Sequence, residues 1–273
     1  MLLETPMLAA YATVVATLVG LVMGSFLNCL AWRMTHGESV MHGRSHCTSC
    51  GHVLGPLDLV PVLSWVFSRG RCRYCGERVS WRYPATEVLC AVVYASLVVR
   101  YGLTLQTIEL IAFASVLLVL SLTDLDEYVI PNVTIVVAIV IRLAYIVAEG
   151  ILGSGDALIM LRDAAIGGIA VAVPVLLLAL VMDHVLGRES LGGGDVKLLF
   201  VAGLYFGWQQ CLFLLMVACV IGLVFAAIGR HGTNAGSESN ARLIPFGPSI
   251  AAACWITMLF GDQVLRWYLT LFL

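Results

Sequence analysis

Long apolar segments dominate this chain of 273 residues and constrain its fold more than any other feature. A helix needs about 20 apolar residues to cross the hydrocarbon core of a bilayer, and runs of this length recur along the sequence. We identify eight of them, near residues 8–30, 84–100, 104–123, 133–150, 164–187, 196–209, 211–229 and 247–272. With 60% hydrophobic and 12% charged residues, the composition excludes an ordinary soluble domain. The sequence therefore predicts an all-α polytopic membrane protein with about eight transmembrane helices.

One polar stretch, residues 33–83, interrupts the apolar pattern and concentrates the positive charge. It contains seven arginines and three acidic residues, a balance of +4, whereas the rest of the chain carries eight basic and fourteen acidic residues. Arginine and lysine accumulate in the cytoplasmic loops of membrane proteins, and acidic residues have little influence on orientation. We therefore expect residues 33–83 in the cytoplasm. Threading eight helices from this insertion brings Asp124 and Asp195 to the same cytoplasmic face.

Two C-x-x-C pairs lie in this insertion, Cys47 with Cys50 and Cys72 with Cys75, and 21 residues separate them. A glycine follows each pair, and the spacing is typical of zinc ribbons with four thiolate ligands. Disulfides and an iron–sulfur cluster are the alternatives, but a reducing cytoplasm disfavours disulfides and the equal spacing of the pairs favours a metal. We predict that the four cysteines bind Zn²⁺, which has the structural role of folding an insertion too small for its own core.

An apolar segment, residues 56–65, runs between the two cysteine pairs. It is too short and too rich in proline to cross a membrane. We expect it either to lie at the membrane interface, with Trp65 at the depth of the headgroups, or to pack on the zinc unit.

Two aspartates lie at the ends of predicted spans. Asp124 follows the apolar run 108–122, and Asp195 follows three glycines at 192–194. Pro131 cannot continue a helix, so we expect Asp124 on a turn at the mouth of the bundle. The glycines predict an elbow with positive φ, after which Asp195 opens a helix. Ionisable residues beside membrane spans are costly, and they are therefore candidates for a functional site.

An ordinary solvated helix end is the alternative explanation for each aspartate taken alone. The presence of both aspartates on one face of the membrane favours a catalytic role instead. Two carboxyl groups brought within about 3 Å of each other share one proton, so one can activate a water while the other donates to a carbonyl oxygen. The two residues therefore predict an aspartic hydrolase with a catalytic pair.

Taken in order, these motifs resemble those of the type IV prepilin peptidases, bacterial inner-membrane members of the GxGD aspartyl protease family. The resemblance covers nearly the whole chain. It is carried by Gly24-Ser25-Phe26-Leu27-Asn28 with Arg33, the two cysteine pairs, Pro61-Val62-Leu63-Ser64-Trp65, Gly70-Arg71-Cys72, Arg82-Tyr83-Pro84 with Glu87, Asp124 with Pro131-Asn132, and Gly192-Gly193-Gly194-Asp195-Val196-Lys197. It implies that Asp124 and Asp195 are the catalytic residues and that Asp126 is not.

The resemblance also implies a substrate and a location. The expected reaction removes a short, positively charged leader, just after a glycine, from prepilins of type IV pili or from pseudopilins of type II secretion. The expected partners are these membrane-anchored precursors and the lipid bilayer, with no nucleic acid. The enzyme would be a multi-pass protein of the bacterial inner membrane with its active site facing the cytoplasm. Residues 1–32 would form the first transmembrane helix, 33–83 the zinc-binding insertion, and 84–273 the peptidase core.

A second activity follows from the resemblance alone. Many relatives with all four cysteines also methylate the new N-terminal amine with S-adenosylmethionine. The sequence lacks the glycine-rich loop of soluble methyltransferases, so the insertion and adjoining helix ends would have to bind the methyl donor. Asn28, Arg33 and Glu87 are the candidates, and helix capping or interfacial anchoring explains each of them equally well.

Two other functions remain as alternatives. One is a leader peptidase without methyltransferase activity, in which residues 33–83 are only structural. The other is a zinc-binding membrane transporter or scaffold. Transporters usually contain internal repeats with interrupted helices in matching halves, and residues 84–150 and 164–229 have no such symmetry. A scaffold would explain the cysteines but would leave the glycine–aspartate motif unexplained.

Two further features concern the packing of the spans. Arg142 lies in the middle of an apolar segment, so we expect it to snorkel, to pair with an acid such as Asp163 or Glu149, or to face the interior of the bundle. Gly167 and Gly168 are expected to allow close contact between helices, with no part in the chemistry.

Overall fold

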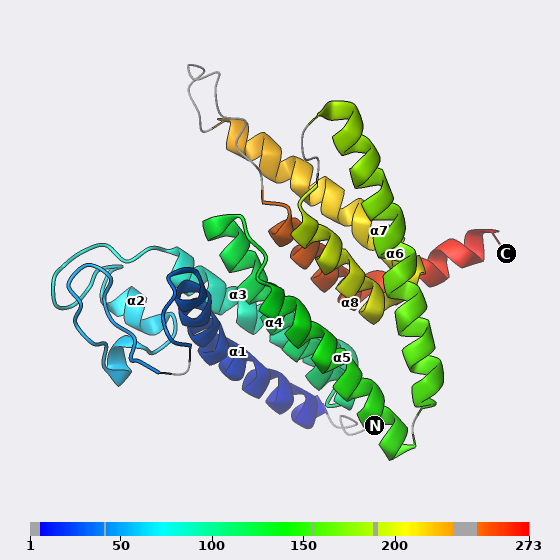
Figure 1. Cartoon of the computed structure of the whole chain (residues 1–273). Helices are drawn as coiled ribbons and strands as arrows, with labels where there is room; N and C mark the ends of the chain where they lie inside the picture. The colour runs from blue at the N-terminus through cyan, green and yellow to red at the C-terminus, as the bar shows by residue number, and fades with distance from the viewer. Residues whose placement is uncertain (1–5, 41, 154, 188–190, 232–244, 273) are drawn as a thin grey trace. The chain divides into compact units, whose positions relative to one another are not determined.

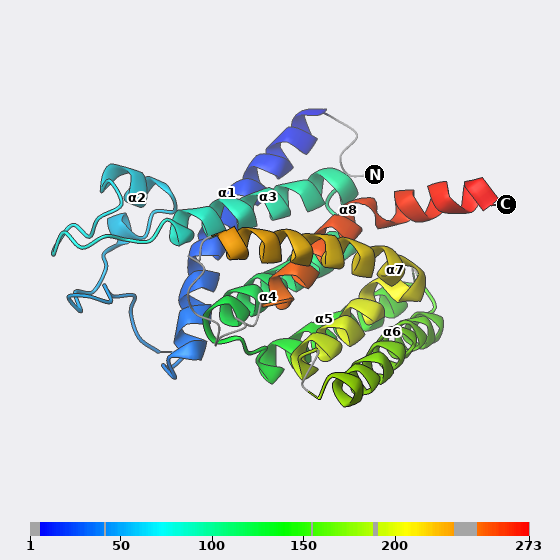
Figure 2. The ribbon, with the colours of Figure 1, turned by 90° about the horizontal axis from the view of Figure 1, so that it is seen from above.

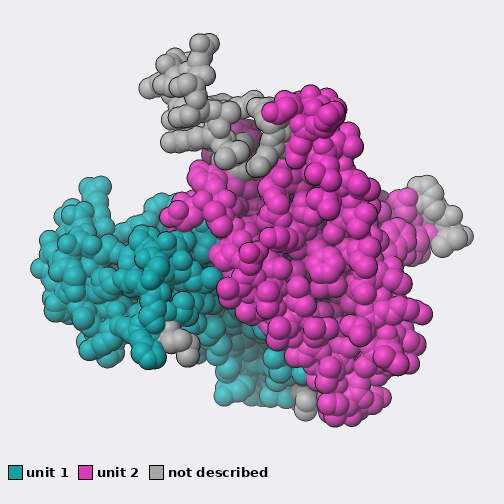
Figure 3. All heavy atoms as spheres, viewed as in Figure 1, with its two compact units in different colours: residues 1–123 teal, residues 124–273 magenta. Residues whose placement is uncertain are grey.

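The computed structural model describes residues 6–40, 42–153, 155–187, 191–231 and 245–272. These residues fold as helices with connecting loops and two isolated β-bridges. The helices are α1 (Pro6–Thr35), η1 (Pro56–Asp58), α2 (Leu63–Phe67), α3 (Arg82–Tyr101), α4 (Leu105–Glu127), α5 (Asn132–Leu152), α6 (Ala157–Leu186), α7 (Gly193–His231) and α8 (Gly247–Phe272). Two compact units divide the chain between Thr123 and Asp124 (Figure 3).

Seven of the described helices, α1 and α3 to α8, are long and apolar enough to cross a membrane. Helix α1 shows the physical reason for this assignment. It buries Ala12 and Ala16, yet it also exposes Leu18, Val22 and Phe26, each more than half accessible. A helix that is apolar on its exposed face as well as its buried face is stable in lipid and not in water. The predicted all-α membrane fold is therefore confirmed.

Helix α7 is broken within its length. Gly207 has φ 70° and ψ 169°, which is not a helical conformation, and the chain changes direction there (Figures 1 and 2). The two arms, residues 193–206 and 208–231, correspond to the predicted spans 196–209 and 211–229. The positive φ falls on a glycine because a side chain would strain the backbone in this conformation.

In the first unit, α1 and α3 pack closely through two glycines of α1. A Cβ atom on Gly20 would lie 2.6 Å from the Cα of Ala91, and one on Gly24 would lie 2.7 Å from the Cα of Glu87. The core beside this contact contains Ala12, Ala16, Leu27, Ala31, Cys90, Tyr94, Val98, Val119 and Leu122. These contacts fix the beginning of α3, where Glu87 lies, against α1.

In the second unit, α6 and α7 make the closest contact, and glycines form it. A Cβ atom on Gly203 of α7 would lie 2.7 Å from the Cα of Gly168, and Gly167 lies against the backbone of Gly203 and Gly207. The predicted role of Gly167 and Gly168 is therefore confirmed. Helix α5 packs on α6 and α7, and α8 packs on α7. Small residues allow such an approach where apolar side chains gain nothing by leaving lipid.

Arg142 of α5 faces other helices of this unit, which agrees with the expectation that it faces the interior of the bundle. Its guanidinium lies 5.4 Å from the ring centroid of Tyr205 in α7 and 5.5 Å from that of Tyr145. Both distances are typical of cation–π contacts. The Tyr205 hydroxyl also donates to the Ala138 carbonyl at 2.7 Å. Arg142 and Tyr205 therefore join α5 to α7.

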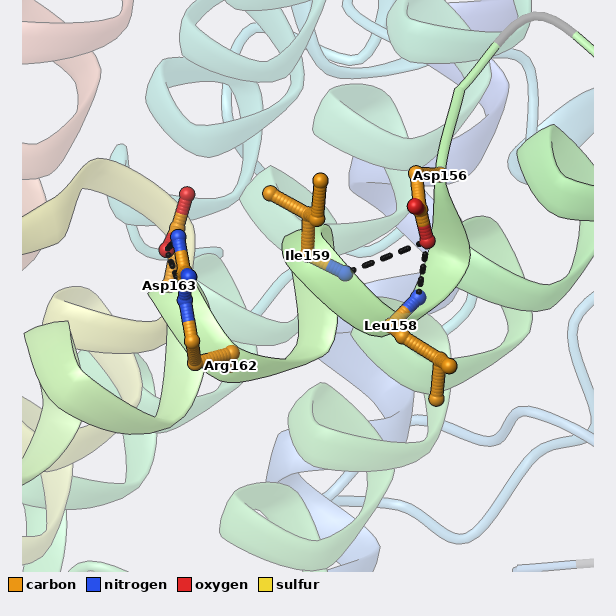
Figure 4. Close-up of polar contacts among 5 residues, drawn as sticks. All are labelled: Asp156, Leu158, Ile159, Arg162 and Asp163. Carbon is orange, nitrogen blue, oxygen red and sulfur yellow. Dashed lines mark hydrogen bonds and ion pairs between the residues drawn. The ribbon is translucent and has the colours of Figure 1, made fainter.

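Asp163, one of the two acids suggested as a partner for Arg142, has an ion-pair partner next to it in the sequence. Asp163 pairs with its neighbour Arg162, at 2.8 Å between Nη2 and Oδ1 (Figure 4). At the start of the same helix, Asp156 caps α6, because its Oδ1 accepts from the backbone N–H groups of Leu158 and Ile159 at 3.0 and 3.4 Å (Figure 4). Such a cap satisfies donors that the first helical turn leaves unpaired.

The glycine contact between α6 and α7 predicts a difference between two substitutions on α7. Gly203→Ala should lower the free energy of unfolding by about 1 to 3 kcal/mol, because its Cβ would overlap the backbone of α6. Gly193→Ala is the matched control, since a Cβ there meets no atom within 4 Å. Thermal unfolding in detergent measures both, and equal midpoints for the two variants would contradict the packing described.

Candidate active site and metal centre

Asp124 lies in the last turn of α4 and is 6% exposed. The predicted turn position is therefore wrong, because the helix continues for three residues beyond Asp124, to Glu127. The turn comes after it, where the Tyr128 N–H donates to the Asp124 carbonyl at 3.0 Å and Tyr128 has φ 56°. Pro131 then occupies the N-cap position of α5. Asp124 thus sits on a regular helix, which holds its carboxyl group more rigidly than a loop would.

The first residue of α8, Gly247, holds the Asp124 carboxyl group. Its backbone N–H donates to Asp124 Oδ2 at 3.0 Å, and a Cβ atom on it would lie only 2.7 Å from the same oxygen. Helix N-termini carry unpaired N–H groups that suit carboxylates. This contact was not predicted, because a glycine at the start of an apolar segment is a weak signal by itself.

Asp195 lies in the first turn of α7, as predicted, and its N–H donates to the Gly192 carbonyl at 3.0 Å. The predicted glycine elbow is wrong. None of the three glycines has a positive φ, and Gly193 and Gly194 already belong to α7. The absence of a side chain serves close packing instead, since a Cβ atom on Gly194 would lie 2.9 Å from the Cβ of Ile130.

The second unit brings Asp124 and Asp195 together although they lie 71 positions apart in the sequence. The Gly194–Ile130 contact joins the start of α7 to the connection between α4 and α5. Nearby, Lys197 Nζ donates to Asn132 Oδ1 at 2.9 Å. The two carboxyl groups are close enough to interact electrostatically. Asp126, which the resemblance excludes from catalysis, is exposed.

Cys47, Cys50, Cys72 and Cys75 meet in the first unit. Their four Sγ atoms lie within 4.8 Å of one another, and those of Cys47 and Cys75 are 3.9 Å apart. A tetrahedral zinc ion with Zn–S bonds of about 2.3 Å needs S–S separations of about 3.8 Å. All four are free thiols, so the geometry fits a metal centre and not the alternative of disulfide bonds.

Two similar backbone turns present these sulfurs. The N–H groups of Cys47 and Cys72 donate to the carbonyls of His52 and Glu77, at 2.9 and 2.8 Å. Gly51 and Gly76 close the turns with φ 70° and 74°, which explains the glycine after each pair. Hydrogen bonds from the backbone N–H groups of Cys50 and Ser49 lower the pKa of Cys47 to about 6. This favours the thiolate, the form that binds metals.

The segment between the pairs packs on this unit, which is one of the two predicted arrangements. Trp65 lies against Gly70, where a Cβ atom would be 2.9 Å from its ring, and its Nε1 donates to the Val79 carbonyl at 3.0 Å. Asp58 accepts from the Tyr74 hydroxyl at 3.1 Å and lies 3.4 Å from Arg73. Two contacts thus tie this segment to the second cysteine pair.

A cavity of about 400 Å³ lies beside the cysteine cluster, within the first unit. Its lining includes Trp32, Arg33, Cys47, Trp65, Cys72 and Glu87. Two of the three residues suggested for a methyl donor therefore share this cavity. The third, Asn28, is not among its lining residues, and its amide donates to the Gly24 carbonyl at 3.2 Å and to the Thr86 hydroxyl. The cavity itself was not predicted, because it forms between segments distant in the sequence.

Two family models match most of the chain. Residues 18–101 match the family model described as the bacterial peptidase A24 N-terminal domain, and residues 111–227 match that of the type IV leader peptidase family. No solved structure matches the chain.

Several curated relatives carry the name prepilin leader peptidase/N-methyltransferase. The one from Pseudomonas putida is 31% identical over 277 residues, which cover 93% of both chains. The one from Bacillus subtilis (strain 168) is 29% identical, over 92% of this chain and 95% of its own. The one from Aeromonas hydrophila is 33% identical, over 86% of this chain and 78% of its own.

The cysteine geometry predicts one zinc ion per purified chain. Cys72→Ser should remove most of this zinc and lower the unfolding temperature, because the insertion depends on the metal for its fold. Cys219→Ser, which changes an exposed cysteine outside the cluster, should keep the zinc content of the wild type. Elemental analysis decides the matter, and iron in place of zinc, or full zinc in Cys72→Ser, would refute the assignment.

Proposed function

Since the chain belongs to the type IV prepilin leader peptidase/N-methyltransferase family, we propose that it cleaves the leader from prepilins or pseudopilins after a glycine and methylates the new N-terminal amine. The chain is a multi-pass membrane protein of a bacterial family. One observation carries the peptidase assignment: in the second unit, Asp124 accepts a hydrogen bond from the first N–H of α8 and interacts electrostatically with Asp195 in the first turn of α7. The curated relatives carry names that state both activities.

In the proposed cleavage, one aspartate is ionised and the other protonated. The ionised carboxylate accepts a proton from a water whose oxygen attacks the carbonyl carbon of the scissile glycine, and the protonated carboxyl group donates to the carbonyl oxygen. The C–N bond then breaks as the nitrogen takes the proton that the first aspartate accepted from the water, and the second aspartate regains its proton from the oxygen as the new carboxyl group forms. The hydrogen bond from Gly247 supports this chemistry, because it fixes the Asp124 carboxyl group before the substrate binds.

We place this reaction at the cytoplasmic face of the inner membrane. The arginine-rich insertion supports this orientation through the positive-inside rule. A positively charged leader would remain on the same side for the same reason. Within the second unit, the starts of α5, α7 and α8 lie at one end of the helices (Figure 1), so a single face of the membrane would give access to the aspartates.

The proposed second step uses S-adenosylmethionine. The lone pair of the new N-terminal amine forms a bond to the methyl carbon, the C–S bond breaks with its electrons going to sulfur, and the amine loses a proton to water. We assign this step to the insertion at 33–83, which lies between a first helix at 1–32 and a peptidase core at 84–273. A peptidase without the transferase is the alternative.

Substitution of the aspartates tests the peptidase. Asp124→Asn and Asp195→Asn should each lower the cleavage rate at least about 100-fold, because each removes a group that accepts or donates a proton. Asp126→Asn is the matched control, since Asp126 lies on the same helix as Asp124 but is exposed. Cleavage of a purified precursor in detergent is followed by mass spectrometry. Undiminished cleavage in either variant would exclude the proposed catalytic pair.

Methylation is tested on the same product. With S-adenosylmethionine present, the processed N-terminus should gain the mass of one methyl group, and without it the amine should stay unmodified. The zinc-depleted Cys72→Ser variant should cleave but methylate poorly, because its cavity borders the metal centre. If the wild-type enzyme leaves the amine unmodified with the donor present, the methyltransferase is refuted and only the peptidase activity remains.

A further inference from the structure

Nine charged residues line the cavity beside the cysteine cluster, and two of them, of opposite charge, are buried and do not pair with each other. Arg33 is 9% exposed and Glu87 is 7% exposed. Burial of a charge is costly unless an opposite charge or strong hydrogen bonds compensate it. Two such groups facing one cavity of about 400 Å³ therefore mark a site for a ligand with charges of both signs.

Arg33, near the end of α1, lacks a carboxylate partner in the described part of the chain. Its Nη1 donates to the carbonyls of Ser39 and His42 at 3.3 and 3.5 Å, which are long hydrogen bonds. No described acidic residue forms an ion pair with it. The planar guanidinium is suited to bind a carboxylate with two parallel hydrogen bonds. A ligand carboxylate would supply the missing counter-charge.

Glu87, in the first two turns of α3, holds an unusual piece of backbone. Its Oε2 accepts from the Val62 N–H at 2.7 Å, and Val62 has φ 59°, a conformation that β-branched residues rarely adopt. Strained backbone of this kind is concentrated at functional sites. Among the described residues, none donates a hydrogen bond to the other oxygen, Oε1. This oxygen is therefore available to an ammonium group of a ligand.

Two indole rings complete the lining. Trp32 stacks on His36 with ring centroids 4.2 Å apart, and Trp65 is fixed by its hydrogen bond to Val79. Fixed indole rings bind cations through their faces and stack on planar heterocycles. The cavity thus combines groups suited to a carboxylate, an ammonium group and an aromatic or cationic ligand part.

We propose that this cavity binds the methyl donor by its aminoacyl end, with Arg33 on the α-carboxylate and Glu87 on the α-ammonium group. S-adenosylmethionine carries both groups, together with a sulfonium cation and an adenine ring. This assignment rests on the proposed methyltransferase function and adds the residues that recognise the donor. Asn28 is left out, because its amide is bonded within the helix pair α1–α3.

The test compares two ligands that differ in one group. The full-length protein in detergent is titrated calorimetrically with S-adenosylmethionine and with its decarboxylated form, which keeps the ammonium and sulfonium groups. Arg33→Gln should weaken S-adenosylmethionine binding about 10- to 100-fold and leave binding of the decarboxylated form unchanged. A purely structural effect of the substitution would weaken both ligands alike.

Two more variants complete the design. Glu87→Gln keeps an amide oxygen that can accept from the Val62 N–H, so it should weaken both ligands by removing the charge and not by releasing the backbone. Arg69→Gln, an exposed arginine outside the cavity lining, is the matched control and should bind both ligands like the wild type. Zinc content and unfolding temperature verify that each variant is folded.

The outcomes separate this site from the function on which it rests. Unchanged affinity for S-adenosylmethionine in Arg33→Gln, or an equal loss for both ligands, overturns the site while the methyltransferase of the wild type stands. A wild-type protein that cleaves precursors but neither binds the donor nor methylates the product overturns the site and the transferase together. Selective loss for the carboxylated ligand supports the proposal.

Discussion

Hydrocarbon offers no hydrogen-bond partners to a polypeptide backbone, and this constraint governs the whole molecule. Each apolar segment satisfies its N–H and C=O groups internally as a helix, so chemistry requiring free polar groups is restricted to helix ends and loops. The two aspartates follow this rule, since Asp124 lies in the last turn of α4 and Asp195 in the first turn of α7. The free-energy cost of placing an ionisable group in a membrane is tolerable there, because both groups are near the ends of their spans.

Glycines determine how closely these helix ends approach. In lipid, apolar side chains gain little by packing against each other, and backbone-to-backbone contact becomes an important source of attraction. Gly203 allows α7 to lie against α6, Gly194 allows α7 to reach Ile130, and Gly247 allows α8 to donate its first N–H to Asp124. The position of the Asp124 carboxyl group thus depends on a glycine of α8, and that of Asp195 depends on the glycine that precedes it in α7.

The insertion at 33–83 lies outside the apolar spans, and metal ligation is the interaction expected to stabilise its fold. A stretch of this size cannot bury enough apolar surface to fold alone, and ligation of a metal by four thiolates can replace a core. The two cysteine turns and the packing of Trp65 also enclose the cavity that contains Arg33 and Glu87. A metal with a structural role would therefore also shape a binding site, which links zinc content to donor affinity.

Local patterns in the sequence were sufficient for the fold class, for the apolar segments that form helices, and for the four cysteines that the fold brings together. Span length follows from bilayer thickness, the C-x-x-C spacing follows from tetrahedral coordination, and Pro131 stands directly before the first residue of α5. The resemblance pointed to Asp124 and Asp195 as a pair. The sequence also contained enough signal to place Gly167 and Gly168 at a helix contact.

Contacts between segments distant in the sequence determined the details of the site that local patterns did not predict. The sequence predicted a turn at Asp124 and an elbow at Gly192 to Gly194, but Asp124, Gly193 and Gly194 are helical, because intrahelical hydrogen bonds extend to the end of α4 and from the start of α7. The bond from Gly247 joins residues 123 positions apart, and no local pattern encodes it. The same holds for the cavity that unites Arg33 with Glu87. The sequence by itself determined which segments are helices and which residues can bind a metal, whereas only the tertiary structure decided which polar groups face each other, since that depends on packing between helices.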